Sequence, residues 1–184
     1  MGFIPITMTQ HINPLFLCFL ITGFFGCSNK TTTVKTVDFV DINKYSGKWY
    51  EIASFPQSFQ KGCFNTTAVY SPGPDGNIIV ENRCNKDSLT GKESYIKGKA
   101  FVVPNSGNAR LKVQFFWPFK GDYWIIDLAE DYAYAAVGSP NKKYLWILSR
   151  KNVMDEETYA QLLKKLQGMG FDINRLQKTK HSIK

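Results

Sequence analysis

Eight short runs rich in Val, Ile, Tyr, Phe and Trp follow one another between residues 47 and 150, separated by Gly, Pro, Asn and Asp. Such runs are typical of β-strands, and the turn residues predict short links between them. The predicted strands are 47–54, 62–70, 77–84, 94–103, 110–117, 122–128, 132–137 and 143–150. Short links join antiparallel neighbours, and closure removes exposed strand edges. The sequence therefore predicts an all-β, eight-stranded antiparallel up-and-down barrel.

One helix is predicted after the strands. Asp155 is a good N-cap, and apolar residues recur at helical spacing from Tyr159 until Gly168 and Gly170 stop the helix. An amphipathic helix must bury its apolar face, so we expect this α-helix to pack against the outside of the barrel. Residues 171–178 are predicted to add a short terminal strand.

The N-terminal segment is predicted to be an export signal. It contains no Lys, Arg, Asp or Glu, and its apolar run is too short to span a bilayer comfortably. The residues ending in Cys27 resemble a bacterial lipobox, whose Cys is acylated and becomes the mature N-terminus. We therefore expect a lipoprotein signal peptide over 1–26, a tether over 27–37 and the barrel with its helix over 38–184. A plain secretory signal, with Cys27 incidental, is the alternative.

Charge and histidine content narrow the function. The chain has 23 Lys+Arg against 15 Asp+Glu, a net charge of +8, and all the charges follow residue 26. The basic residues are scattered, which favours solvated faces and attraction to anionic lipid over nucleic-acid binding. With only His11 and His181, a catalytic triad, a Cys-His pair or a multi-histidine metal site has little to be built from. We expect no enzyme activity, no cofactor and no metal.

Alternation within the strands predicts the barrel interior. Leu111, Val113, Phe115 and Trp117 share one face of their strand, and Ile96, Gly98, Ala100 and Val102 share one face of theirs. Small inward residues leave room, and an eight-stranded barrel can hold one small ligand. Aromatics over such a space are typical of a site for an apolar or amphipathic molecule. An ordinary packed core is the alternative.

Three segments resemble the motifs of the lipocalins. GKWYEIA, from Gly47, resembles the Gly-x-Trp signature of the first strand, the second motif falls at Asp131 and Tyr132, and the third ends at Arg150. Residues 62–70 and 115–119 and the helix after Arg150 also resemble the bacterial outer-membrane lipoprotein type and its relative apolipoprotein D. The resemblance implies a lipocalin calyx closed at one end by Trp49. The Arg150 guanidinium is then expected to lie across that indole, with its donors free for backbone carbonyls.

The resemblance also implies a function. It predicts binding, storage or transport of fatty acids or lysophospholipids in the barrel lumen of a protein attached by acylated Cys27 to the bacterial outer membrane, facing the periplasm. A lipid-modifying enzyme and a structural envelope lipoprotein with a filled lumen are the alternatives, and a homodimer is left open. The expected ligand contacts are Phe64, Ala68, Val80, Ile96, Ala100, Val113, Phe115, Trp117 and Trp146 in the lumen, with Phe55 and Phe59 in the loop over the open end. Glu51 shares the parity of Trp49 and would need a partner, which the sequence does not identify.

Two cysteines remain in an oxidising compartment once the signal and Cys27 are set aside. A turn centred between Gly73 and Pro74 would place Cys63 opposite Cys84, which predicts a structural disulfide. Apolar alternation in the two strands demands a different register, which a bulge or a one-residue slip would provide. A free, reactive Cys63 is the alternative that an enzyme would use.

Overall fold

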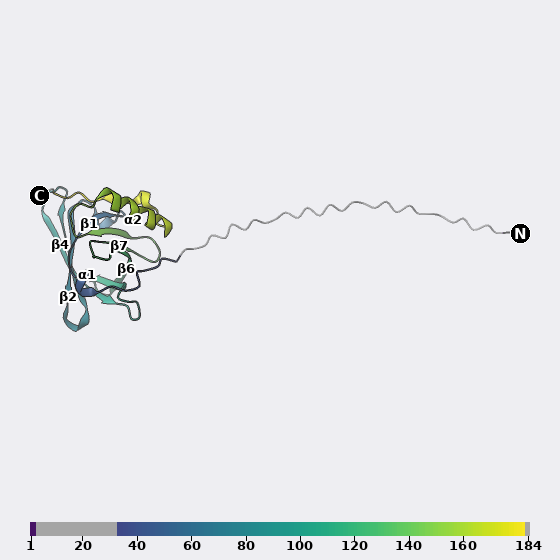
Figure 1. The fold of residues 1–184 in the computed structure, drawn as a ribbon, viewed down its shortest axis with the longest axis horizontal. Helices are drawn as coiled ribbons and strands as arrows, with labels where there is room; N and C mark the ends of the chain where they lie inside the picture. Colours follow the sequence, from purple (N-terminus) through teal and green to yellow (C-terminus); the bar gives the residue numbers. More distant parts are fainter. Residues whose placement is uncertain (3–32, 183–184) are drawn as a thin grey trace. The chain divides into compact units, whose positions relative to one another are not determined.

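The protein is a closed antiparallel β-barrel with one long helix on its outside (Figure 1). The computed structural model describes residues 1–2 and 33–182. Sequential neighbours pair from β2 to β8, β8 pairs with β1, and a β1–β2 pairing closes the barrel. The strands are β1 Gly47–Ser54, β2 Cys63–Pro72, β3 Ile78–Lys86, β4 Glu93–Val102, β5 Arg110–Phe116, β6 Phe119–Leu128, β7 Tyr134–Gly138, β8 Leu145–Ser149 and β9 Gln177–Lys178. All eight predicted barrel strands are present.

The helices are few and short except for one. Helix α1 (Ile42–Tyr45) precedes the barrel and was not predicted, because four residues are too few to show a helical period. Helix α2 (Glu156–Gly168) is the predicted helix, and the Asp155 carboxylate caps it by accepting from the Thr158 amide at 2.8 Å. Residues 33–182 also contain three 3₁₀ turns: η1 (Ser58–Gln60), η2 (Pro74–Gly76) and η3 (Ile173–Arg175).

Hydrogen-bonded aromatics fill the barrel near its closed end. The Tyr123 hydroxyl lies 2.7 Å from the Tyr45 hydroxyl and 2.8 Å from the Tyr70 hydroxyl, among apolar side chains such as Leu111 and Val137. Burial raises the pKa of Tyr70 to about 12 and, as the largest cause, raises the pKa of Tyr45 and Tyr123 well above the usual value. The interior near the closed end is therefore a packed core.

Trp49 and Arg150 close this end, as the resemblance implied. The Trp49 side chain is fully buried and its Nε1 donates to the Tyr45 carbonyl at 2.8 Å. The Arg150 guanidinium carbon lies 3.7 Å from the Trp49 ring centre. The arginine also donates to the carbonyls of Lys44, Tyr45, Ser46, Lys48 and Tyr132.

The other signature residues gather around the same arginine. Gly47 has a φ of +94°, and a Cβ placed on it would lie 3.5 Å from Arg150 Nη1. Asp131 accepts from the Ala133 amide at 3.0 Å, and the Tyr132 hydroxyl accepts from the Asp41 amide at 2.9 Å. The three motifs therefore join the segment before β1, the β6–β7 loop and the end of β8.

A second apolar cluster lies between the barrel wall and helix α2. Leu162 and Leu166 of the helix pack there with outward residues of β1, β6, β7 and β8, which confirms the expected position of the helix (Figure 1). Val34 is 2% exposed in the same cluster, and the Val37 amide donates to the Ile125 carbonyl. Residues 34–37, assigned to a tether from their polar composition, therefore pack on the barrel through their two valines. Cys27 and the predicted signal peptide lie outside the described residues.

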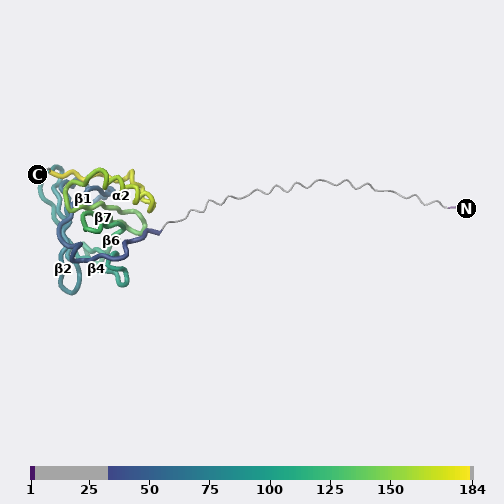
Figure 2. Tube along the Cα trace, in the orientation of Figure 1, coloured from purple at the N-terminus to yellow at the C-terminus, as the bar shows by residue number. Residues whose placement is uncertain are grey.

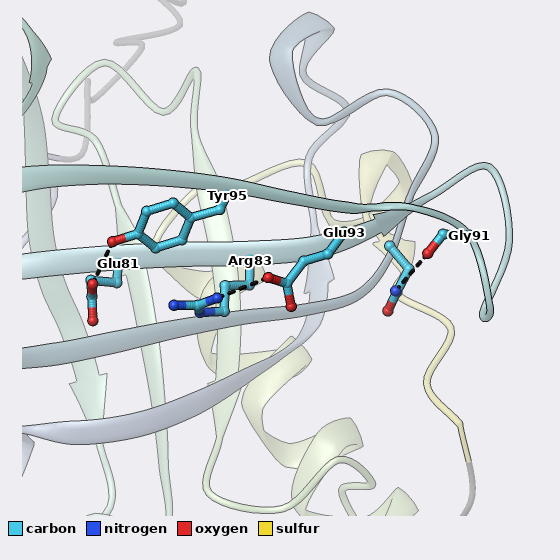
Figure 3. A network of polar contacts seen from close by, with 6 residues as sticks. Glu81, Arg83, Gly91, Glu93 and Tyr95 are labelled. Atoms are coloured by element: carbon cyan, nitrogen blue, oxygen red, sulfur yellow. Dashed lines mark hydrogen bonds and ion pairs between the residues drawn. The ribbon is translucent and has the colours of Figure 1, made fainter.

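The outer face of the barrel between β3 and β4 is polar. Arg83 pairs with Glu93 at 2.8 Å, the Tyr95 hydroxyl donates to Glu81, and the Arg83 guanidinium lies over the Tyr95 ring (Figure 3). These odd-numbered residues alternate with the inward-facing Val80 and Ala100 on the same two strands. The sequence alternation therefore identified the two faces of this part of the sheet.

Register shifts explain where the strand predictions fail. Opposed residues in β2 and β3 sum to 150 from Thr67 to Pro72, so the register predicted from a turn at Gly73 and Pro74 is wrong. The even sum agrees with the apolar alternation, and a bulge between Phe64 and Thr67 supplies the predicted irregularity. The predicted disulfide is present, although Cys63 pairs along the ladder with Lys86 and reaches Cys84 diagonally, with a Cα–Cα distance of 5.4 Å.

Candidate ligand site at the open end of the barrel

The candidate site lies at the end of the barrel opposite Trp49. Because consecutive strands run in opposite directions, the links after β1, β3, β5 and β7 meet at this end. Trp49 and α1 lie at the other end, where the tyrosines fill the interior. A ligand would therefore enter the barrel at the end away from the Trp49 cap.

Most of the predicted lumen residues face the interior. Val80 and Ala100 are buried in the interior cluster, and four others pack against it: Ala68, Val113, Phe115 and Trp146. A Cβ added to Gly98 would meet the Phe115 ring at 2.7 Å, so the glycine makes room for that ring. Ile96 is half-buried in β4 opposite Asn82, on the inward face. Phe64 is half-buried in β2 opposite Asn85, so the bulge before Thr67 turns it to the outer face, against the prediction.

Two further predicted positions are corrected by the structure. Phe55 is 1% exposed in the outer cluster against Phe171, because a register shift between Glu51 and Ala53 reverses the alternation of β1. Trp117 is 86% exposed in the turn between β5 and β6, beyond a register shift that follows Val113. Trp117 therefore does not point into the lumen as alternation predicted, and Phe55 does not lie in the loop over the open end, where it was expected.

The rim of the open end carries exposed aromatics. Phe59 on η1 is 66% exposed, which agrees with its predicted place in the loop over the opening. Phe116, Trp117 and Phe119, at the β5–β6 turn, are 70%, 86% and 76% exposed. The links at this end also hold exposed lysines: Lys61, Lys92, Lys120 and Lys143.

Glu51 is the buried charged group of the site. It is 7% exposed, and its carboxylate accepts from Ser54 Oγ at 3.1 Å, Gln60 Nε2 at 2.8 Å and Thr179 Oγ1 at 2.7 Å. Trp146 Nε1 donates to Gln60 Oε1 at 3.2 Å. Because an indole nitrogen can only donate, this bond fixes the Gln60 amide with its NH₂ toward Glu51. Among residues 33–182, no Lys, Arg or His forms an ion pair with this carboxylate.

The sequence did not reveal these partners. Thr179 is 128 residues from Glu51, and Gln60 belongs to a 3₁₀ turn without a periodic pattern. The available signal was the inward parity of Glu51, which predicted the need for a partner and not its identity.

The C-terminal segment completes the wall beside Glu51. Direct β1–β2 pairing ends at Tyr50 opposite Thr67. Beyond that point β9 pairs with Ala53 and Ser54, the Thr179 amide donates to Ile52, and the Asn65 amide donates to the Lys180 carbonyl. Figure 2 shows this last part of the trace running past β1. Residues 177–182, here called the C-terminal segment, therefore lie between the upper part of β1 and the start of β2.

A cavity of about 400 Å³ opens at this seam. Its lining comes from the end of β1, the η1 loop, Gly62 and Cys63, and the C-terminal segment, and includes Glu51 and Gln57. Both amide atoms of Gln57 are buried, and neither has a hydrogen-bond partner. Ligand pockets in proteins commonly measure 300–1,000 Å³, so the cavity is large enough for a small ligand or part of a larger one.

The state of Cys63 bears on the enzyme alternative. Cys63 is in a disulfide, so the free reactive Cys63 of the enzyme alternative is wrong. In the part of the chain that the structure describes, no group of three or more His, Cys, Asp or Glu side chains is placed to hold a metal ion. None of the helices between residues 33 and 182 is long and apolar enough to cross a membrane.

A capped eight-stranded barrel with an apolar wall and one open end defines a calyx-type ligand-binding protein. Comparison with known proteins agrees, since the sequence profile of the lipocalin-like domain matches residues 40–181. The chain belongs to the lipocalin family. This membership supports the binding or transport of small hydrophobic molecules.

Individual relatives cover most of the chain. It is 42% identical to temperature-induced lipocalin-1 of Arabidopsis thaliana (81% of this chain, 83% of the relative) and 39% identical to the outer membrane lipoprotein Blc of Vibrio cholerae (88% and 94%). It is 32% identical to apolipoprotein D of Macaca fascicularis (90% and 93%). The structure of insecticyanin from the tobacco hornworm Manduca sexta shares the fold, with a TM-score of 0.66 at 22% identity over 81% of this chain and 85% of that one.

Proposed function

We propose that this protein binds, stores or carries single-chain amphipaths, fatty acids or lysophospholipids, inside its barrel and without chemical conversion. The acyl chain lies against the inward faces of β3, β4 and β5, and the polar head lies at the open end. The proposed wall contacts are Ala68, Val80, Ile96, Ala100, Val113, Phe115 and Trp146. Phe59 is proposed to cover the opening from its exposed position on the η1 loop.

The observation that carries this proposal is the change from apolar to polar side chains along the barrel interior, from the Trp49 end to the open end. The interior is packed near Trp49, lined by the half-buried Ile96 toward the open end, and polar at the seam that holds Glu51. An amphipath has the same order of groups, with an apolar end and a polar end. A barrel built only for structure gains nothing from a buried carboxylate that has no cation beside it.

We also propose a location at the bacterial outer membrane, with attachment through acylated Cys27 and the barrel facing the periplasm. The relationship to Blc outer membrane lipoproteins supports this location. The exposed Phe116, Trp117 and Phe119 beside exposed lysines suit contact with anionic headgroups at the open end. Labelling with radioactive palmitate, in the native chain and in Cys27→Ser, tests the attachment, because only the native chain should incorporate label.

The function is tested by ligand uptake with the purified full-length chain after lipid extraction. We expect saturable, one-to-one binding of oleate or oleoyl-lysophospholipid, and mass spectrometry of the extract should identify a single-chain lipid. Absence of saturable uptake of both classes would reject the proposal and favour the structural envelope protein with a filled barrel. Conversion of the added lipid into a product would instead favour the lipid-modifying enzyme.

A further inference from the structure

The cavity at the β1–β2 seam contains polar groups that the fold leaves unsatisfied. Glu51 accepts three hydrogen bonds, all from neutral side chains, while an ionised carboxylate has about four acceptor positions. Gln57 adds a buried amide whose donor and acceptor are both unpartnered. Buried polar groups are nearly always paired in native proteins, so unpaired groups lining one cavity indicate a bound partner.

The charge arrangement of the cavity selects the partner. Glu51 is buried, whereas the two lysines that line the cavity, Lys61 and Lys178, are exposed. Lys178 already pairs with Glu156 at 3.2 Å and lies over the Tyr159 ring. The buried part of the cavity therefore presents an uncompensated carboxylate beside an amide oxygen. A cation satisfies both acceptors, whereas an anion would be repelled by Glu51.

The seam is also connected to the lumen. Gln60 donates to Glu51 and accepts from Trp146, whose ring packs against the interior cluster. Glu51 lies opposite Leu148, a member of the same cluster, in the β1–β8 ladder. A head group at Glu51 can therefore belong to a molecule whose chain lies in the barrel.

We propose that Glu51 and Gln57 form a head-group site for the ammonium group of an amphipathic ligand. The ammonium donates to the free acceptor position of the Glu51 carboxylate and to the Gln57 amide oxygen. This inference rests on the proposed lipid-binding function and selects among its ligands, because it favours amine-bearing lysophospholipids over fatty acids and over phosphate-headed lipids without an amine.

The test compares two ligands with the same oleoyl chain, lysophosphatidylethanolamine and lysophosphatidic acid, by calorimetric titration of the delipidated full-length protein. We expect the wild-type chain to prefer the ethanolamine lipid by about tenfold or more, as a charge-assisted hydrogen bond to a buried carboxylate allows. In Glu51→Gln, which keeps the side-chain volume and removes the charge, the preference should fall to about twofold or less. Glu157→Gln, on an exposed helix position, is the matched control and should keep the full preference.

Gln57→Met provides an independent second variant. It leaves the Glu51 hydrogen bonds in place, removes only the unpartnered amide, and should lower the preference by about threefold. If near-ultraviolet circular dichroism shows that Glu51→Gln has lost its fold, the ligand preference of Gln57→Met tests the head-group site instead. An unchanged preference in the folded variants, or equal binding of both lipids by the wild type, overturns the head-group site and leaves lipid binding standing. If the wild-type protein binds neither of these lipids and does not bind oleate either, the proposed function itself is overturned.

Discussion

Arg150 lies flat over the Trp49 indole, 3.7 Å from the ring centre, and donates to five backbone carbonyls from the segments 44–48 and 132. The guanidinium thus joins the segment before β1, the β6–β7 loop and the end of β8. Replacement by Met keeps the aliphatic stem and leaves these carbonyls without their donor. We expect Arg150→Met to lower the free energy of unfolding by about 3 kcal/mol or more, measured by urea titration. Arg83→Met, which removes an exposed ion pair, should cost less than about 1 kcal/mol.

The Tyr123 hydroxyl is the shared partner of two buried hydroxyls, those of Tyr45 and Tyr70. Tyr123→Phe keeps the ring and leaves both without that partner, so we expect a loss of about 2–4 kcal/mol in the free energy of unfolding. Tyr144→Phe, at a 42% exposed position, is the control and should change it by less than about 0.5 kcal/mol. Equal effects of the two substitutions would contradict a buried network.

The same tyrosines predict alkaline sensitivity. Burial raises the pKa of Tyr70 from about 10 in the unfolded chain to about 12 in the folded protein. A raised folded pKa gives stability that is complete below pH 10 and is lost as the pH rises toward 12. From Tyr70 alone the loss amounts to about 3 kcal/mol. Urea titrations between pH 7 and 12 should show a plateau followed by this fall, and Tyr70→Phe should make the fall shallower. A decline that begins at neutral pH would exclude the tyrosines as its cause.

The Cys63–Cys84 disulfide closes a loop with a sequence separation of 21 residues. We expect the double substitution Cys63→Ser, Cys84→Ser to lower the free energy of unfolding by about 3 kcal/mol. Thermal unfolding of the wild type with and without dithiothreitol measures the same contribution of the disulfide to stability. A reductant effect in the double variant would show that the disulfide is not its source.

The proposed lumen is tested by filling it. Ile96 is half-buried on the inward face of β4, and Ile96→Trp should lower ligand affinity about tenfold because the larger ring occupies the space of the acyl chain. Lys97→Trp adds the same ring on the exposed face of the strand and should leave affinity within about twofold. Calorimetric titration with oleoyl-lysophospholipid measures both. Equal affinities in the two variants would place the ligand elsewhere.

Strand content and the two faces of β3 and β4 were predictable, because alternation is a local signal that survives wherever the ladder is regular. It failed for Phe64 and Trp117, since a register shift separates each from the regular part of its ladder and leaves no hydrophobic trace in the sequence. The Trp49–Arg150 pair was predictable from the lipocalin motifs alone. The surroundings of Glu51 were not predictable. Thr179 is 128 residues away in the sequence, and Gln57 stands out only because its buried amide has no hydrogen-bond partner in the structure.

The C-terminal segment occupies the gap beside β1 that β2 leaves open. Thr179, which joins Glu51 there, is translated 128 residues later. On the ribosome, β1 is thus made long before the segment that pairs beside it. The seam around Glu51 can therefore close only after the C-terminal segment has been made.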